Sequence, residues 1–341
     1  MDFVRVWRFC TVAFALMASG AIHAAQSMAF APLSAEAQAA AMHRGMNILN
    51  DDHIWDGPSQ ARFQLRHFAV LHDAGFDIVR LNMHAIAHVD DSGTLDPVWL
   101  VTLDRLVDSA LGNGLTVVLD DHDDLVCEND VPDCGRKLHA IWSQLGSRYR
   151  NRSNRLLFEF LNEPHGNLTA APWNTMMRDL LAVVRATNPE RNVVIGPAGW
   201  SSVEQLSTLD LPAEDRHIIV TVHYYAPVAF THQGARWVEE TKNLSGITWG
   251  TDAELAKLVK DFDAVKAWSD VHQRPIFLGE FGAYEKGDMD SRARYLSAVA
   301  RVAEAHGFPW AYWQFDSDFI AYDVDKDEWI EPILKALVPS D

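Results

Sequence analysis

Eight short segments rich in branched apolar residues recur along this chain, and a stretch with helical periodicity separates each from the next. Runs such as Thr116–Leu119 and His217–Val222 are apolar on both faces, which is typical of a parallel sheet covered by helices. Eight such strands in 341 residues predict a single-domain α/β fold, the closed (β/α)8 TIM barrel. The predicted strands are residues 44–48, 77–82, 115–119, 156–161, 192–195, 217–222, 276–279 and 310–314.

The segments between these strands carry recognisable helix signals. Ser59 is predicted to cap the first helix, which would end at Gly75, and Pro97 is predicted to open the second. An open doubly wound sheet is the alternative, but it usually carries a glycine-rich phosphate loop, and the sequence has no G-x-G-x-x-G motif. Further helices are predicted at residues 140–149, 173–186, 253–271 and 291–305.

The N-terminus has the layout of a secretory signal peptide. Arg5 and Arg8 precede an apolar stretch, and small residues then lead to a plausible cleavage site after Ala24. The apolar run is too short to span a bilayer, which needs about 20 residues. We therefore predict a signal peptide at residues 1–24, a lead-in at 25–41 and a (β/α)8 barrel domain at 42–341, in a secreted or periplasmic protein that does not bind membranes.

Two cysteines remain after such cleavage. Cys127 and Cys134 are seven positions apart, and an even number of cysteines in an oxidising compartment favours a disulfide between them. Closing so short a loop would stabilise the fold by about 2–3 kcal/mol in the chain-entropy model. Two free thiols or a metal site that includes the cysteines are the weaker alternatives.

The formal net charge of −18 limits the partners of the protein. Nucleic-acid-binding proteins present basic patches, so this composition argues against nucleic acid as a partner. A neutral polysaccharide meets no electrostatic conflict. We expect a monomer that binds polysaccharide.

Polar residues gather where the predicted strands end, which is where a barrel of this type carries its active site. Glu163 directly follows the fourth strand and Glu280 the seventh, so both side chains are expected to enter one cleft. Retaining glycosidases use two carboxyl groups about 5–5.5 Å apart, one as nucleophile and one as general acid/base. Either glutamate alone would be read as a surface residue at a strand end, whereas the pair predicts catalysis.

The two carboxyl groups must titrate differently to do this chemistry. We expect Arg80 and Tyr225 to lie beside Glu280 and to favour its charged form. We expect the negative charge of Glu280 to raise the pKa of Glu163, which must stay protonated until the leaving group departs.

An ordered set of residues across six strands resembles glycoside hydrolase family 5, the cellulase family of clan A. The set comprises Arg80 in IVRL, His122 in LDDH, Asn162 and Glu163 in NEP, His223 and Tyr225 in HYY, Glu280 in GEFG and Trp313 in AYWQFD. The resemblance extends from about residue 42 to the end of the chain. It implies a retaining mechanism with no metal or organic cofactor.

The resemblance also assigns a role to each residue. Glu163 would be the acid/base and Glu280 the nucleophile, while Asn162 would bind the sugar 2-hydroxyl. Arg80 and Tyr225 would position Glu280. In the same comparison His122 and His223 line the cleavage subsite, and Trp313 stacks under the sugar ring.

Several features depart from the family pattern or leave alternatives open. The acidic DDHDD segment at residues 120–124, the segment at 51–55 and His84 have no assigned role. A metallohydrolase built on DDHDD is disfavoured, because consecutive strand-end residues point in different directions. A non-catalytic sugar-binding barrel would not need both glutamates. The expected substrate is β-1,4-glucan or mixed-linkage β-glucan, with β-mannan, xyloglucan and xylan as alternatives.

Overall fold

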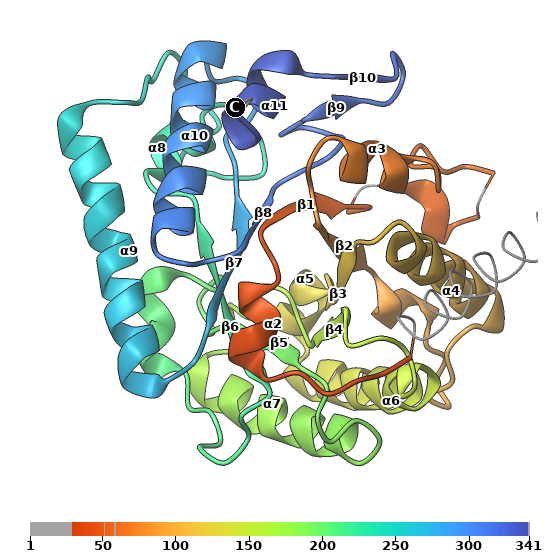
Figure 1. Ribbon diagram of the computed structural model, residues 1–341. Helices are drawn as coiled ribbons and strands as arrows, with labels where there is room; N and C mark the ends of the chain where they lie inside the picture. Colours follow the sequence, from red (N-terminus) through yellow and green to blue (C-terminus); the bar gives the residue numbers. More distant parts are fainter. Residues whose placement is uncertain (1–28, 51, 58, 340–341) are drawn as a thin grey trace, which may run out of the picture.

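The computed structural model describes residues 29–50, 52–57 and 59–339. Within it, eight parallel strands form a closed barrel in the order β1 to β8, and helices surround the ring (Figure 1). The predicted (β/α)8 fold is therefore confirmed. The strands are β1 Arg44–Ile48, β2 Ile78–Met83, β3 Thr116–Asp121, β4 Leu156–Glu159, β5 Val193–Ile195, β6 Ile218–Tyr224, β7 Ile276–Phe281 and β8 Trp310–Tyr312. The predicted signal peptide lies outside the described residues.

Helices fill the connections and extend past the barrel at both ends. The α-helices are α2 Ala35–Ala40, α3 His67–Asp73, α4 Pro97–Gly112, α5 Asp124–Asn129, α6 Val131–Tyr149, α7 Ala170–Arg185, α8 Val228–Thr231, α9 Asp252–His272, α10 Met289–Ala305 and α11 Glu331–Leu337. Short 3-10 turns span His53–Trp55, Ala85–His88 and Val203–Thr208, and a hairpin pairs β9 Tyr322–Asp323 with β10 Glu328–Trp329. In the part of the chain that the structure describes, no helix combines the length and apolar character needed to cross a membrane.

Two helix boundaries differ from the sequence prediction for identifiable reasons. Ser59 does not cap the first barrel helix, which begins only at His67. The amide of Phe63 donates instead to Asp52 Oδ2 at 2.6 Å, so this stretch has a hydrogen-bond partner outside a helix. Helix α6 begins nine residues before the predicted residue 140, at Val131, because the Asp130 side chain caps it by accepting from the Asp133 amide.

The N-terminal end of the barrel is closed by apolar packing. Helix α2 begins at the cap Ser34, whose side chain accepts from the Ala37 amide, and it lies across the ring of strands (Figure 1). Its buried residues Ala35 and Ala39, with Met42, form one cluster with residues near the N-terminal ends of the strands. The strand residues of this cluster are Ile78, Val118, Leu157, Val194, Ile219, Phe277 and Ala311.

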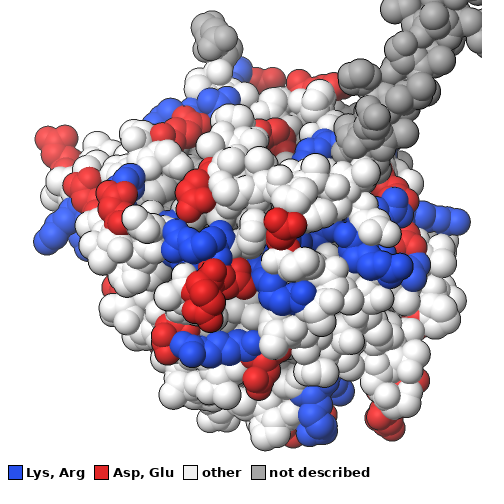
Figure 2. Space-filling view, turned by 60° about the horizontal axis from the view of Figure 1, so that its bottom comes forward, with Lys and Arg blue, Asp and Glu red and all other residues white. Residues whose placement is uncertain are grey.

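The face of the molecule drawn in Figure 2 carries charged side chains of both signs. On the face drawn in Figure 2, lysine and arginine side chains alternate with aspartate and glutamate. Such mixing on this face, with the net charge of −18, is unlike the continuous basic surface of a nucleic-acid-binding protein.

Candidate active site

Two glutamates face each other at the C-terminal rim of the barrel. Glu163 lies just beyond β4 with a backbone φ of 36°, a conformation that non-glycine residues rarely adopt and that often marks a functional site. Glu280 lies on β7. One carboxylate oxygen of each and one ring nitrogen of His223 all lie within 4.8 Å of one another. The two carboxyl groups are therefore much closer than the 6.5–9.5 Å typical of inverting glycosidases.

Arg80 organises the charges below the two glutamates. It is fully buried on β2 and donates from Nη1 to Glu280 Oε1 at 2.6 Å and from Nε to Glu159 Oε2 at 2.8 Å. It also donates to Asn162 Oδ1 at 2.9 Å and forms an ion pair with Asp120 at 3.1 Å. Burial disfavours its charge, but the surrounding carboxylates raise the pKa of Arg80 well above its usual range. Glu280 thus faces a permanent cation.

The environment of Glu163 keeps its carboxyl group protonated. Burial raises the pKa of Glu163 to about 8, and the negative charge of Asp124 acts in the same direction. The sequence argument had assigned this shift to Glu280, so the expected cause was wrong. His223 Nδ1 lies 2.6 Å from Glu163 Oε1, and burial lowers the pKa of His223 to about 4. At neutral pH the hydrogen bond between them therefore joins a neutral carboxylic acid to a neutral imidazole.

Tyr225, His122 and Trp313 complete the set of residues predicted to form the site. The Tyr225 hydroxyl donates to Glu280 Oε2 at 2.9 Å. The rings of His122 and Trp313 stack with centroids 5.2 Å apart, and His122 Nδ1 lies 2.6 Å from Asp120 Oδ2. Burial opposes a charge on His122, but Asp120 outweighs it and raises the pKa of His122 to about 9.

A register shift between β6 and β7 places His223 directly opposite Glu280. The residue before Glu280 has to be glycine for this arrangement. A Cβ atom at Gly279 would lie 2.5 Å from Thr221 Oγ1 and 2.9 Å from His223 Nε2. Local irregularities of this kind often direct side chains into active sites.

The chain matches a known family over most of its length. A family model described as cellulase (glycosyl hydrolase family 5) covers residues 35–318. The chain belongs to glycosyl hydrolase family 5.

Similar proteins agree with this membership. Endoglucanase H of Acetivibrio thermocellus is 33% identical over 250 residues, which are 72% of this chain and 26% of that protein. The crystal structure of endoglucanase Cel5A from Thermotoga maritima has a TM-score of 0.86 at 34% identity, covering 90% of this chain and 100% of that one. A structure of the same Cel5A in complex with a mannotriose substrate has a TM-score of 0.85 at 34% identity, covering 89% and 99%. The chain spans between 26% and 62% of the length of five curated relatives.

Sequence reasoning missed several residues of this family 5 site. Asn47 on β1 accepts from Arg80 at 2.9 Å and donates to the Gly279 carbonyl at 2.9 Å, and Glu159 holds Arg80 through both of its carboxylate oxygens. The signal for Glu159 was a charged residue at the end of the otherwise apolar strand β4. Trp200, beyond β5, has an indole that is 58% exposed and stacks on His165 at 5.0 Å. Its exposure cannot be read from sequence.

The carboxylates of the acidic segment 120–124, which begins within β3, have different partners. Asp120 reaches Arg80 and His122, whereas Asp123 accepts from the Ile86 amide at 2.7 Å and lies 3.5 Å from His84 Nδ1. Among the described residues, the histidines and carboxylates spaced closely enough to hold a metal are the trio Glu163, His223 and Glu280. The carboxylates of the DDHDD segment therefore bind different partners around the rim, because consecutive side chains at a strand end point in different directions.

Asp52, in the unassigned segment at 51–55, lines a cavity formed largely by residues that follow β1 and β8. Asp52 accepts from the amides of Ile54 and Phe63 at 2.8 and 2.6 Å, so it shapes the loop after β1. A cavity of about 240 Å³ lies there, lined by Arg62 and Gln314 among others.

Proposed function

We propose that this protein is a retaining, endo-acting β-glycoside hydrolase whose substrate is β-1,4-glucan or mixed-linkage β-glucan. The observation that carries the proposal is the pair Glu163 and Glu280, in which one carboxylate oxygen of each lies within 4.8 Å of the other. Retaining glycosidases place their two carboxyl groups about 5–5.5 Å apart. The names of the similar proteins, endoglucanases, support the choice of substrate and of internal cleavage.

In the proposed first step, Glu280 acts as the nucleophile. Its carboxylate, held by Arg80 and Tyr225, forms a bond to the anomeric carbon while the bond from that carbon to the glycosidic oxygen breaks. Glu163 gives its proton to the departing oxygen, for which a carboxyl pKa of about 8 is well suited at neutral pH. The products of this step are a glycosyl ester of Glu280 and a shortened chain with a new hydroxyl group.

In the second step, water breaks the ester. Glu163, now a carboxylate, takes a proton from water as the water oxygen bonds to the anomeric carbon. The bond between that carbon and Glu280 breaks, and both glutamates return to their starting states. Two inversions at the same carbon leave the product with the configuration of the substrate. No cofactor takes part in the proposed reaction.

The roles proposed for the remaining residues follow from their positions. Asn162 binds the sugar 2-hydroxyl, and Trp313, stacked on His122, offers its face to the apolar face of the sugar ring. His122 and His223 line the same subsite. We further propose that the protein is secreted or periplasmic, which the disulfide supports, and that it acts as a monomer.

The test is release of reducing sugar by the wild type and by Glu280→Gln on a panel of polysaccharides. The panel holds carboxymethylcellulose, barley β-glucan, mannan, xyloglucan and xylan. Mannan is the second candidate, because one similar structure contains mannotriose. We expect cleavage of the glucans by the wild type, with a rapid fall in viscosity that marks internal cleavage, and none by the variant. Equal cleavage by both proteins would refute the role of Glu280. No cleavage by either would favour a sugar-binding barrel.

A further inference from the structure

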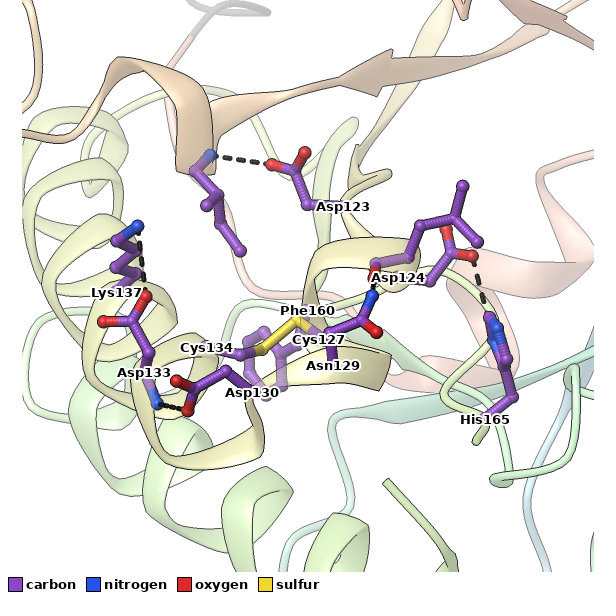
Figure 3. Close-up of a disulfide and its surroundings, with 12 residues drawn as sticks. Asp123, Asp124, Cys127, Asn129, Asp130, Asp133, Cys134, Lys137, Phe160 and His165 are labelled. Carbon is purple, nitrogen blue, oxygen red and sulfur yellow. Dashed lines mark hydrogen bonds and ion pairs between the residues drawn. A yellow bond between two sulfur atoms is a disulfide. The ribbon is translucent and has the colours of Figure 1, made fainter. Parts of the chain in front are cut away.

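Helix α5 is a six-residue element that a disulfide fastens to the body of the protein. Cys127 on α5 is bonded to Cys134 on α6, and both residues are fully buried (Figure 3). Helix α6 is anchored at this point by the Asp130 cap. A helix of six residues has few internal hydrogen bonds to fix its position. The bridge therefore adds a second covalent link between α5 and the much longer α6, besides their connection through Asp130.

The first residue of α5, Asp124, contacts the loop from Asn162 to Gly166, which carries Glu163. Asp124 Oδ1 accepts a hydrogen bond from Asn162 Nδ2 at 3.0 Å, while Arg80 donates to Asn162 Oδ1 at 2.9 Å. A donor on one side and an acceptor on the other fix the orientation of the Asn162 amide. Asp124 engages one amide hydrogen, which leaves the second free for a sugar hydroxyl.

The same helix supports the backbone that carries Glu163. His165 Nδ1 lies 2.7 Å from the Glu163 carbonyl oxygen and 3.8 Å from Asp124 Oδ2, the pair that Figure 3 shows side by side. Glu128, also on α5, lies 3.6 Å from His165 Nε2. Glu128 packs directly over Gly166, where a Cβ atom would lie 2.1 Å from its Cγ. Both ends of α5 thus touch the loop between Glu163 and Gly166.

We propose that helix α5, held by the Cys127–Cys134 disulfide, positions the loop from Asn162 to Gly166. In this proposal Asp124 is the positioning residue that orients the Asn162 side chain and supports the backbone that carries Glu163. This inference rests on the proposed function, since it assigns Asn162 and Glu163 to catalysis. It gives a role to the second half of the acidic segment and to the cysteine pair, neither of which takes part in the chemical steps.

The electrostatics of Glu163 agree with this geometry. Burial is the largest cause of its raised pKa, and Asp124 follows, whereas the cationic forms of His122, Arg80 and His165 oppose it. Removing the charge of Asp124 should lower the pKa of Glu163, so that the acid loses its proton at a lower pH. The other groups that face this carboxyl group are neutral His223 on β6, Tyr225 just beyond β6 and Glu280 on β7.

The experiment compares Asp124→Asn, Asp124→Ala and the control Asp133→Asn. Asp133 is a carboxylate next to Cys134 that pairs with Arg136 and Lys137 on α6. The measurements are kcat and KM between pH 5 and 10 on barley β-glucan and on 4-nitrophenyl β-cellobioside, with thermal unfolding to show that each variant is folded.

Each variant has its own expected result. Asp124→Asn keeps an acceptor for Asn162, so we expect mainly a downward shift of the alkaline limb of kcat/KM. Asp124→Ala should show this shift and lose roughly tenfold or more in kcat/KM, since small misplacements of catalytic groups have effects of this size. The loss should be greater on β-glucan, whose poor leaving group needs the acid. Asp133→Asn should match the wild type. A wild-type rate and pH profile for Asp124→Ala would overturn the proposal.

The role of the disulfide is tested by a double-mutant cycle. Cys127→Ala/Cys134→Ala is measured alone and combined with Asp124→Ala, at a temperature where all variants are folded. If the bridge acts through Asp124, its removal lowers kcat/KM and shifts the alkaline limb, and the two sets of changes combine less than additively. A bridge variant with lower stability but an unchanged pH profile would overturn the role of the disulfide.

Glu163→Gln separates this inference from the function on which it rests. It should abolish cleavage of β-glucan but keep much of the first step on 4-nitrophenyl β-cellobioside, whose leaving group needs little protonation. If Glu163→Gln cleaves β-glucan at the wild-type rate, the proposed function is wrong. If it is inactive while Asp124→Ala behaves as the wild type, only the role of helix α5 is wrong.

Discussion

The two ends of the barrel bury opposite kinds of side chain on the same eight strands: apolar groups at one end and ionisable groups at the other. At the N-terminal end, small apolar residues of helix α2 cover a layer of aliphatic and aromatic side chains. At the C-terminal end, the buried Arg80 lies 2.8 Å from the buried carboxyl group of Glu159 and 3.1 Å from that of Asp120. The first arrangement stabilises the fold by removing apolar surface from water. The second gains little net stability from its ion pairs, and we propose that its role is to orient the charged groups around Glu163 and Glu280.

The largest expected effect on activity comes from replacing the proposed nucleophile at the C-terminal rim. Glu280→Gln should lower kcat/KM on barley β-glucan by a factor of at least about 10³, because no other group at this position can form the glycosyl ester. Its thermal unfolding should stay close to that of the wild type, since the amide preserves the shape of the side chain and Arg80 keeps Glu159 and Asp120 as partners. Activity within tenfold of the wild type would contradict the contrast between the two ends.

Arg80→Met should damage both stability and activity. It leaves Glu280, Glu159 and Asp120 buried without their cation, which costs about 3–5 kcal/mol in comparable buried pairs. We expect urea unfolding to report a loss of that size and kcat to fall by about 10²-fold or more. Arg80→Lys is the matched control, because it keeps the charge but not the planar fork, and should recover part of the stability. Unchanged stability in Arg80→Met would show that the buried charges are not coupled.

The pH dependence of the wild type tests the protonation of Glu163. Its pKa is raised from the ordinary carboxyl value of 4.5 to about 8, and the first step needs the protonated form. The rate should therefore be maintained through neutral pH and fall about tenfold per unit once the pH exceeds about 8. The check is kcat/KM on an unactivated oligosaccharide between pH 5 and 10. An alkaline limb near pH 5 would contradict the proposed environment of this carboxyl group.

A charge introduced at the N-terminal end of the barrel should lower stability and leave kcat unchanged. Ala39→Asp places a carboxylate in the apolar layer beneath the strands, where Ala39 is 4% exposed. We expect a loss of roughly 2–3 kcal/mol in the free energy of unfolding, with kcat unchanged while the protein is folded. Ala37→Asp, on the exposed side of the same helix, is the control and should leave both unchanged. A large loss of kcat in folded Ala39→Asp would mean that the two ends are not independent.

The smallest effect is expected at the edge of the cleft. Trp200→Ala removes an exposed indole that stacks on His165, and ring stacking contributes about 0.5–1.5 kcal/mol. We therefore expect KM for long oligosaccharides to rise about two- to tenfold with little change in kcat. Trp268→Ala, on the outer helix α9, is the control. An unchanged KM in Trp200→Ala would exclude this ring from the substrate path.

The sequence predicted the barrel and the residues that gather at its C-terminal rim better than it predicted the residues that support them. Strand periodicity reveals which residues end each strand, so Glu163, Glu280 and Arg80 stand out. Glu159 and Asn47 point into the barrel from within strands, and their partnership with Arg80 depends on register across the ring. The role of Ser59 was predicted wrongly, because the acceptor for the Phe63 amide, Asp52, is eleven residues away. Interactions that cross the barrel require the assembled structure.

The most direct test of the account is identification of the residue that forms the covalent intermediate. The protein is incubated with 2-deoxy-2-fluoro-β-cellobiosyl fluoride, which slows release of the glycosyl group, and the modified peptide is located by mass spectrometry. The account predicts one added fluorocellobiosyl group, attached to Glu280 and absent from Glu280→Gln. A label on another carboxylate, or first-formed products of inverted anomeric configuration, would contradict it.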